Sequence, residues 1–364
     1  MKTVLFLANK DNVLYNFRKE VVMAVKNAGY RVVLCSPYGK KIDYFIERNC
    51  EFIDISMDRR GTNIFNDFKL IRSYKRIIKK VKPDIVLTYT SKPSIYGGYI
   101  CGKCKIPYIV NNAGLMETEG MLAAILRILY RVGWSNASCM MYQNIREKEV
   151  VNPILKNKVR YRIIPGSGVN LEEFTYRKYP ADDDVIIFNY VARIVKMKGI
   201  EEYLECAKKI KLKFPNTEFR IFGDFDDDKY REQISNLEKE NIVKYYGVQF
   251  DMKPYIEEAH AVIHPSYYEG MTNVVLEHGA VGRPSIGSDI PGVREEIEDG
   301  RTGFLFKVKD VDSMVLSVES FLKLSHDEKV LMGINARKKM ESCFNRDIVI
   351  DIYMEEIKNV LYNN

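Results

Sequence analysis

Short apolar runs alternate with segments of helical spacing along the whole chain. The runs are rich in β-branched and aromatic residues, which is typical of strands. In the first half they cover 3–8, 31–36, 84–89, 107–112, 137–142 and 159–165. In the second half they cover 185–192, 218–223, 242–247, 261–266, 284–289 and 303–306. Strands that alternate with helices predict the α/β class, with parallel, doubly wound sheets.

The alternation is interrupted near the middle of the chain. Residues 165–174, PGSGVNLEEF, are rich in turn formers, and residues 176–184, YRKYPADDD, are polar and contain a proline. A chain of 364 residues is also long for one hydrophobic core, and two domains are the usual solution. We therefore expect Rossmann-like domains at 1–168 and 185–345, joined by a linker at 169–184.

Two helical segments close the chain, at about 310–342 and 346–361. The second of them follows the end of the second domain. We expect residues 346–364 to pack back on the N-terminal domain.

Composition excludes several classes of protein. Hydrophobic residues make up 46% and charged residues 29%, as in ordinary globular proteins. The apolar start of the chain ends at Asn9, too early for a signal peptide. No run approaches the roughly 18 apolar residues of a membrane span, so a cytoplasmic protein is expected. The seven cysteines are scattered, and the pair Cys101 and Cys104 has no partners at zinc-ligand spacing, which favours reduced thiols.

Charge is divided unevenly along the chain. Residues 1–180 carry 31 Lys and Arg against 15 Asp and Glu, a net of +16, whereas the remainder is net −9. A basic half indicates an anionic partner, such as a nucleic acid, a phosphorylated substrate or an anionic membrane surface. No known nucleic-acid-binding module is present, so we do not expect nucleic acid.

Two helical stretches of the basic half could lie on a membrane. Residues 69–82, KLIRSYKRIIKKVK, place seven cations among apolar residues. A helix packed on the sheet with a solvated basic outer face explains this stretch equally well, and we favour it. Residues 121–134, MLAAILRILYRVGW, are strongly apolar, and for them we favour contact with a membrane or an acceptor.

The segment SYYEGMTNVVLEHG, at 266–279, holds Glu269 and Glu277 eight residues apart. It follows a predicted strand, and helical spacing begins at Asn273. A helix N-terminus offers unpaired N–H groups and a favourable dipole to an anion. The two glutamates lie about 12 Å apart at 1.5 Å per residue, roughly the distance from a hexose across a diphosphate to a ribose. From spacing alone, a solvated helix residue and a loop charge remain the alternative.

Two further segments follow predicted strands. In 192–205, Arg193 and Lys198 flank a turn with Gly199, and two cations at a strand end can clamp a diphosphate; ordinary surface charge is the alternative. In 220–230, RIFGDFDDDKY, Gly223 precedes an acidic run. That run is similar to the D-x-D of metal-dependent sugar transferases, but we favour an acidic N-cap and first helical turn.

Taken together, these segments resemble a known family. RIVKMKG, FGD, HPSYYEGMTNVVLE, GRPSIGSDIPGVREEIEDGRTGFLF and PGSGVNLEEF have the order and spacing found in family 4 retaining glycosyltransferases of the GT-B fold. The resemblance is strong over about 160–345. Over 1–160 it rests on LYNFR, KPDIV and KIPYIV, as in bacterial members that build capsule, O-antigen or exopolysaccharide. It implies two Rossmann-like domains that face each other across a cleft.

The resemblance implies a role for each motif residue. Glu269 would contact the hydroxyls of the donor sugar, and Glu277 would hold the ribose. Arg193 and Lys198 would neutralise the departing nucleoside diphosphate, so no metal or other cofactor is expected. Met271, Thr272 and Asn273 would bind the distal phosphate through backbone amides, and Gly270 would let it approach closely. The base pocket would comprise Gly223, Tyr246, Gly247, Val248 and Phe250.

The N-terminal half departs from the family pattern. The usual Gly-Gly loop after the first strand is replaced by ANKDNVLYNFR, and NNAGLMETEG at 111–120 lacks the usual histidine. All four histidines lie in the second half, where we interpret His260 and His264 as structural or cleft-lining. Candidates for the acceptor side or the cleft are Asn12, Tyr15, Asn16, Arg18, Asn112, Gly114, Glu117 and Glu119.

The resemblance implies a metal-independent hexosyltransferase. The donor would be a nucleotide diphosphate sugar, such as UDP-Gal, UDP-GalNAc, UDP-Glc or UDP-GlcNAc. The acceptor would be a polyprenyl-diphosphate-linked saccharide at the inner membrane face, where the basic domain would bind anionic lipid. Alternatives are a non-catalytic sugar-nucleotide-binding subunit and a UDP-sugar epimerase of the same fold.

Overall fold

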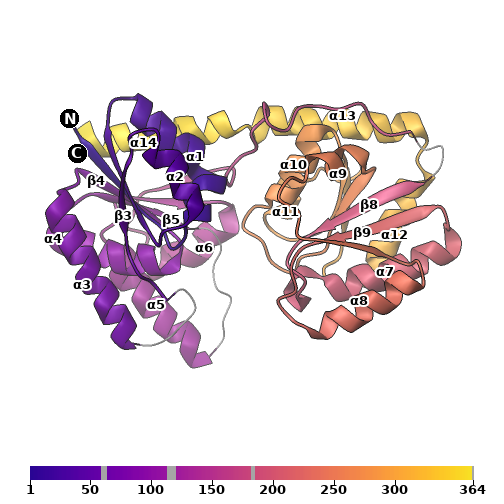
Figure 1. Ribbon diagram of the computed structural model, residues 1–364, viewed down its shortest axis with the longest axis horizontal. Coiled ribbons are helices and arrows are strands. Elements are labelled where there is room, and N and C mark those ends of the chain that lie inside the picture. The colour runs from indigo at the N-terminus through magenta and orange to yellow at the C-terminus, as the bar shows by residue number, and fades with distance from the viewer. Residues whose placement is uncertain (59–63, 113–119, 182–184, 363–364) are drawn as a thin grey trace. The chain divides into compact units, whose positions relative to one another are not determined.

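A computed structural model describes residues 1–58, 64–112, 120–181 and 185–362 (Figure 1). The chain forms two compact units. One comprises residues 1–167 and 347–364, and the other comprises 168–346. Each unit contains a parallel sheet with helices on both faces, which confirms the predicted α/β class.

The first unit is built on a parallel sheet of seven strands among its described residues, in the order β3-β2-β1-β4-β5-β6-β7. The strands are β1 (Thr3–Leu7), β2 (Arg31–Ser36), β3 (Glu51–Asp54), β4 (Ile85–Tyr89), β5 (Tyr108–Asn111), β6 (Cys139–Tyr142) and β7 (Tyr161–Ile163). The central strands β1 and β4 are buried at every position. A parallel sheet covered on both faces requires this, because neither face meets water.

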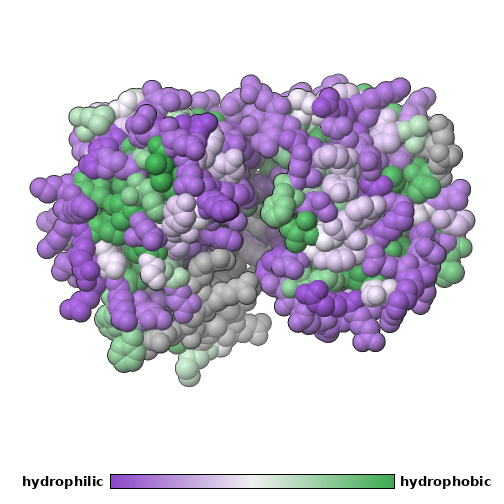
Figure 2. Space-filling model, viewed as in Figure 1, coloured by the Kyte–Doolittle hydropathy of each residue, from purple (hydrophilic) through white to green (hydrophobic). Residues whose placement is uncertain are grey.

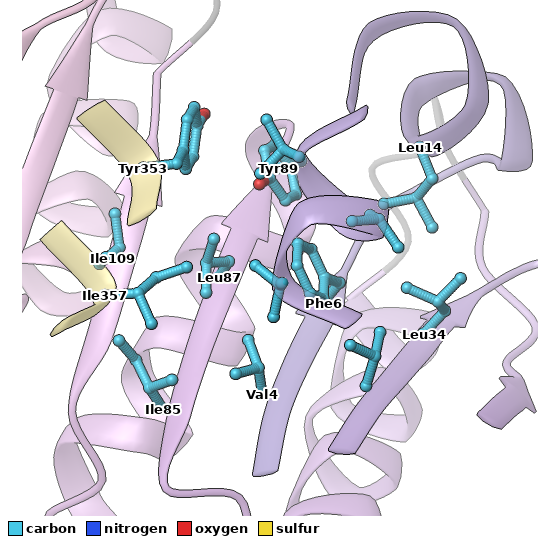
Figure 3. Close-up of a cluster of buried hydrophobic side chains, with 14 of the residues drawn as sticks. Val4, Phe6, Leu14, Leu34, Ile85, Leu87, Tyr89, Ile109, Tyr353 and Ile357 are labelled. Carbon is cyan, nitrogen blue, oxygen red and sulfur yellow. The ribbon is translucent and has the colours of Figure 1, made fainter. Parts of the chain in front are cut away.

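Helices cover both faces of this sheet. They are α1 (Asp11–Asn27), α2 (Asp43–Ile46), α3 (Ile64–Val81), α4 (Gly98–Cys104), α5 (Gly120–Trp134), α6 (Ile145–Ile154) and α14 (Arg346–Tyr362), with short turns at Lys40–Ile42 and Pro93–Gly97. Side chains of α1, α2 and α14 form one buried cluster with the sheet, and those of α3 to α6 form another. Figure 3 shows Tyr353 and Ile357 of α14 beside the strand residues Leu87 and Ile109. Helix α14 thus completes the core of the N-terminal unit.

The second unit contains a six-stranded parallel sheet among its described residues, in the order β10-β9-β8-β11-β12-β13. The strands are β8 (Ile186–Val191), β9 (Thr217–Phe222), β10 (Lys244–Gly247), β11 (Ala261–His264), β12 (Ser285–Ser288) and β13 (Gly303–Phe306). The helices are α7 (Ile200–Lys213), α8 (Lys229–Lys239), α9 (Lys253–Glu258), α10 (Asn273–Val281), α11 (Val293–Glu296), α12 (Val311–Lys323) and α13 (His326–Cys343), with a short turn at Lys196–Lys198. Helices α7, α8 and α12 share the main hydrophobic cluster of this unit.

The structure differs from the sequence prediction at three places. Residues 169–181 are not a free linker: Val169 and Tyr179 are buried, and the Tyr179 hydroxyl donates to His260 O at 2.7 Å. Strand β3 was not predicted, because its outer residues are exposed and its run is short. The helical segment at 310–342 is two helices, since Ser325 and Glu328 form a capping box that begins α13.

The two stretches with a membrane alternative have different surroundings. In α3, the apolar residues Leu70, Tyr74 and Ile78 are buried in the core, and the cations lie on the outer face. The favoured interpretation of 69–82 is therefore confirmed. Helix α5 buries Tyr130 and Trp134 but leaves other apolar residues exposed. None of the helices in the described part of the chain is long and apolar enough to cross a bilayer.

Candidate functional site

The strongest candidate site lies at the carboxyl edge of the second sheet. Strands β9, β8, β11 and β12 are neighbours in this sheet, so the loops that follow them meet at one edge. These loops carry residues 223–228, 192–199, 265–272 and 289–292. Ligands of doubly wound sheets bind at such edges. Arg193, Lys198, Gly223 and Glu269 fall on these loops, whereas Glu277 lies in α10 and Tyr246 to Phe250 lie at the end of β10 and beyond it.

Two glycines bring the loops into close contact. Gly199 has φ +70°, and a Cβ there would lie 2.1 Å from Pro265 O. Gly292 has φ +93°, and its Cβ would lie 2.2 Å from Gly270 O. Only glycine tolerates both the positive φ and the close approach of another backbone. The loop that carries Glu269 is thereby held between the loops after β8 and β12.

Glu269 lies at the centre of a small buried charge cluster. Lys198 Nζ donates to Glu269 Oε1, and His264 Nε2 lies 3.2 Å from the same oxygen. The side chains of Lys198 and Glu269 are 21% and 15% exposed. Three elements therefore converge here: the turn before α7, the end of β11 and the loop after it.

This cluster keeps Glu269 ionised. Burial alone would raise the pKa of Glu269, but the contact with His264 and the charge of Lys198 lower it to about 2. A carboxylate in this state accepts hydrogen bonds and donates none. It can therefore receive the hydroxyl hydrogens of a sugar.

The backbone between the two glutamates is partly occupied. Thr272 is the N-cap of α10 and its hydroxyl accepts from Val275 N at 3.3 Å. The Thr272 amide donates to Glu296 Oε1 at 2.6 Å. The resemblance implied that this amide binds a phosphate, whereas in the structure it donates to a buried glutamate. The amides of Met271 and Asn273 form no hydrogen bond with a described residue.

Glu277 lies one turn into α10, in a different environment. It forms no ion pair or hydrogen bond with the residues that the structure describes. Burial raises the pKa of Glu277 to about 7, against the opposing charge of Arg346 and with a small contribution from Glu173. A half-buried carboxyl without a partner has its hydrogen-bonding capacity available to a ligand.

The second predicted cation, Arg193, is exposed and paired. Arg193 Nη1 donates to Asp226 Oδ2 of the acidic run after β9. Asp227 accepts from the Lys229 amide at 3.1 Å, next to the start of α8. Within the acidic run, Asp226 therefore pairs with a cation, and Asp227 accepts a backbone hydrogen bond at the start of α8. Among the described residues, no group of three or more His, Cys, Asp or Glu could hold a metal.

The expected base pocket is aromatic. Tyr246 stacks on Phe222 with ring centroids 5.0 Å apart, and Tyr255 lies edge-on to Tyr246 at 5.5 Å. Gly223 N donates to Gly247 O at 2.9 Å, which joins the ends of β9 and β10. The side chains of Val248 and Phe250, just beyond, are exposed. Exposed apolar side chains next to a strand end are suited to stacking on a base.

The N-terminal candidates lie in the other unit. Asn16 accepts from Lys41 Nζ at 2.7 Å and Tyr15 packs edge-on to Tyr44, so both have local structural contacts. Asn12 is half-buried at the start of α1. Arg18 and Asn112 are buried. Gly114, Glu117 and Glu119 lie outside the described residues.

Family profiles match nearly the whole chain. The profile described as "Glycosyl transferases group 1" matches residues 172–339, and the profile "Glycosyl transferase 4-like" matches residues 3–144. The chain therefore consists largely of a glycosyltransferase 4-like domain followed by a group 1 glycosyltransferase domain. The resemblance to family 4 enzymes that its motifs indicated is thus confirmed.

Relatives of this glycosyltransferase include two bacterial enzymes with lipid-linked acceptors in their names. One is the UDP-Gal:alpha-D-GlcNAc-diphosphoundecaprenol alpha-1,3-galactosyltransferase of Escherichia coli, 26% identical over 90% of this chain and 89% of that protein. Another is the N,N'-diacetylbacillosaminyl-diphospho-undecaprenol alpha-1,3-N-acetylgalactosaminyltransferase of Campylobacter jejuni, 22% identical over 98% of this chain and 99% of that protein. A solved glycosyltransferase from Rickettsia africae superposes with a TM-score of 0.81 at 18% identity, covering 100% of this chain and 99% of that one. This likeness assigns the GT-B fold.

Proposed function

We propose that this glycosyltransferase transfers a hexose from a UDP-sugar to a lipid-diphosphate-linked saccharide during surface polysaccharide assembly, with retention of the anomeric configuration. The observation that carries the proposal is the ionised Glu269 held by Lys198 at the N-terminus of α10. A sugar diphosphate laid along this segment has its hydroxyls at a carboxylate and its phosphates at amides and a cation.

In the proposed transfer, the enzyme stabilises the negative charge of the leaving diphosphate, and no side chain is assigned as a nucleophile. The bond from the anomeric carbon to the diphosphate oxygen breaks, the acceptor hydroxyl oxygen bonds to that carbon on the same face, and the hydroxyl proton passes to the departing diphosphate oxygen. Lys198 and Arg193 would balance the charge that develops on the diphosphate, in the place of a metal ion. Glu269 would hold the sugar in position, and such placement is a large part of catalysis in reactions of this kind.

The nature of the substrates rests on the relatives. Both curated relatives have an undecaprenol-linked diphosphate in their names, and one has UDP-Gal. The aromatic pair Phe222 and Tyr246, with Val248 and Phe250 beyond it, would form the base pocket. Glu277 would bind the ribose from α10.

Substitution of the charge pair tests the proposal. In Glu269→Ala and Lys198→Ala, transfer to a lipid-diphosphate acceptor should fall about 10²- to 10³-fold, since each removes a group that acts on the reacting sugar diphosphate. Circular dichroism should show that both variants remain folded. A screen of nucleotide sugars by donor hydrolysis selects the donor first. Near-normal transfer by both variants would refute the assignment, and a purified chain that neither hydrolyses nor transfers any donor would favour a binding subunit.

The membrane would be contacted by an apolar stripe on α5. Met121, Ile125, Ile128 and Val132 follow one another at helical spacing, and all four are exposed. In Figure 2 the main group of hydrophobic residues on the first unit lies at the left of the view, higher than the position of α5 in Figure 1, so it is distinct from this stripe. Phe65 and Phe68 at the start of α3 are exposed as well. With the net positive charge of 1–180, these residues suit the interface of an anionic bilayer.

Binding to vesicles tests this surface. The double variant Ile125→Glu/Ile128→Glu should co-sediment with anionic vesicles several-fold less than the unmodified protein at low salt. Leu212→Glu is the matched control, because Leu212 is an exposed apolar helix residue of the second unit. Equal loss in the control, or no binding of the unmodified protein, would contradict the proposed surface.

A further inference from the structure

The first unit contains a buried arginine whose charge is not balanced by a carboxylate of the described residues. Arg18, on α1, is 3% exposed. Its Nη1 donates to Phe17 O at 2.6 Å and to Ser167 Oγ at 2.9 Å, and its Nε has no hydrogen-bond partner. Buried charges in proteins are normally paired, because an isolated one costs several kcal/mol. This exception needs a physical reason.

Aromatic rings supply part of that reason. The guanidinium carbon lies 5.5 Å from the ring of Tyr89 and 5.6 Å from the ring of Tyr353. Figure 3 shows both tyrosines at the same end of the buried cluster, where β4 ends. The negative faces of these rings attract the cation electrostatically. They lower the cost of the charge, but they do not supply a counter-ion.

The position of Arg18 is that of a ligand site. Tyr89 ends β4 and Asn111 ends β5, and the Tyr353 hydroxyl donates to Asn111 Oδ1. Ligands of parallel sheets bind at the carboxyl ends of their strands. Asn112, one residue further, is 6% exposed, and its Nδ2 also has no partner. Three buried polar groups of this edge, Arg18 Nε, Asn112 Nδ2 and the Tyr89 hydroxyl, thus have no hydrogen-bond partner among the described residues.

We infer that Arg18 binds a phosphate group, and that this group is the diphosphate of the lipid-linked acceptor. The second half of this inference rests on the proposed function. Nη1 now donates only to neutral acceptors, whereas a phosphate oxygen forms charge-assisted hydrogen bonds about twice as strong. A phosphate oxygen that replaces the Ser167 hydroxyl would pair the guanidinium charge at Nη1. The N–H of Nε points to the Nη2 edge, where a second oxygen of a diphosphate would accept from it. The site therefore takes a phosphate or diphosphate anion.

An internal counter-ion should close this site. The variant Ser167→Asp places a carboxylate where the Ser167 hydroxyl now accepts from Arg18. We expect its melting temperature to rise by a few degrees and its affinity for inorganic pyrophosphate to fall at least about tenfold. Titration calorimetry is done with saturating UDP, so that the donor site of the second unit is filled. Ser135→Asp, which adds the same charge at an exposed position just after α5, controls for net charge and should bind like the unmodified protein.

The second part of the experiment removes the charge of Arg18. Arg18→Met keeps the length of the side chain and should lose pyrophosphate binding without loss of thermal stability, because it removes an uncompensated buried charge. A purely structural arginine would give the opposite result, a lower melting temperature with unchanged pyrophosphate affinity. Unchanged affinity in Ser167→Asp would overturn the site even if Arg18→Met did not fold.

The source of the phosphate is decided by two further measurements. Farnesyl diphosphate should bind more tightly than inorganic pyrophosphate and depend on Arg18 in the same way; equal affinities would overturn the lipid assignment. In transfer assays, Ser167→Asp should raise the KM for the acceptor at least about tenfold, and more than the KM for the donor. An unmodified protein without transferase activity would refute the proposed function, but an Arg18-dependent pyrophosphate affinity would still establish the anion site.

Discussion

Glu269 and Glu277 are two glutamates of the same segment, yet their surroundings shift their pKa values in opposite directions. Glu269 is held by Lys198 and lies near His264, and its pKa is lowered to about 2. Glu277 forms no ion pair or hydrogen bond with a described residue, and burial raises its pKa to about 7 against the opposing charge of Arg346. In the proposed donor site, the carboxylate assigned to the reacting sugar already has its partners, whereas the carboxyl assigned to the ribose has no hydrogen-bond partner without a ligand.

The difference follows from where each residue lies. Glu269 is in a loop that can be reached by a lysine of the neighbouring loop after β8 and by a histidine at the end of its own strand, β11. Glu277 lies within α10, so the residues near its side chain are determined by how that helix packs. Preorganised charge is most effective where charge develops in the transition state, so a rigid Glu269 suits a catalytic role. An unpaired Glu277 suits a binding role, because the ligand itself satisfies it.

The largest effect should come from moving the Glu269 loop without changing Glu269. Gly292→Ala would place a Cβ 2.2 Å from Gly270 O and 3.1 Å from Glu269 O. Because a displacement of about 1 Å can cost about 10²-fold, transfer should fall by that factor, and the variant should also be less stable. Activity and thermal unfolding would be measured side by side.

Gly300→Ala is the control for backbone strain alone. Gly300 has φ +72°, close to the positive φ of Gly292, but a Cβ there meets nothing within 4 Å. It should cost about 1–2 kcal/mol of stability and leave the transfer rate unchanged. Equal losses of activity in the two glycine variants would show that the contact with the Glu269 loop has no special role.

A smaller effect should come from the amide between the two glutamates. Glu296 is 1% exposed, accepts from the Thr272 amide at 2.6 Å, and burial raises its pKa well above the usual range. Glu296→Ala leaves that amide unpaired and should lower the free energy of unfolding by about 1–3 kcal/mol. Glu296→Gln keeps an acceptor oxygen and, as a mimic of the protonated carboxyl, should cost less than about 1 kcal/mol. Chemical denaturation distinguishes them, and a glutamine variant as unstable as the alanine variant would mean that the carboxyl is ionised.

The sequence predicted the second unit well because its signals are local. Glycines, a strand end and the start of a helix lie within a few residues of Glu269, so their convergence at one sheet edge could be expected. The contact of His264 with Glu269 could not, because it depends on how the loop after β11 folds back onto the end of its own strand. Glu296 was also missed: it is separated from Thr272 by 24 residues, and nothing near it in the sequence indicates its partner.

In the first unit, local sequence signals did not predict the surroundings of the candidate residues. Arg18 was a candidate only through its neighbourhood in LYNFR. Its burial depends on Ser167, 149 residues away in the chain, and on Tyr353 of α14. Helix packing at that distance has no local signature. The same holds for 169–181, where a turn-rich composition predicted a linker although Val169 and Tyr179 anchor the segment to the second unit.

The smallest effect should be a pH dependence that belongs to Glu277 alone. The carboxyl is protonated below a pH of about 7 and ionised above it, and a carboxylate accepts hydrogen bonds from ribose hydroxyls more strongly than a neutral carboxyl does. The Kd for the UDP-sugar should therefore fall about fivefold between pH 6 and pH 8, from a difference of about 1 kcal/mol between charged and neutral hydrogen bonds. Glu277→Gln should make this dependence flat.

The stability of the unliganded protein should respond in the opposite direction. Because the pKa is raised in the folded state, the stabilisation from proton binding is complete below the unfolded pKa and is lost as the pH rises through about 7. Glu277→Gln should therefore melt higher than the unmodified protein at pH 8 and at about the same temperature at pH 4. A variant that keeps the pH step in donor affinity would assign that step to another group and remove the contrast between the two glutamates.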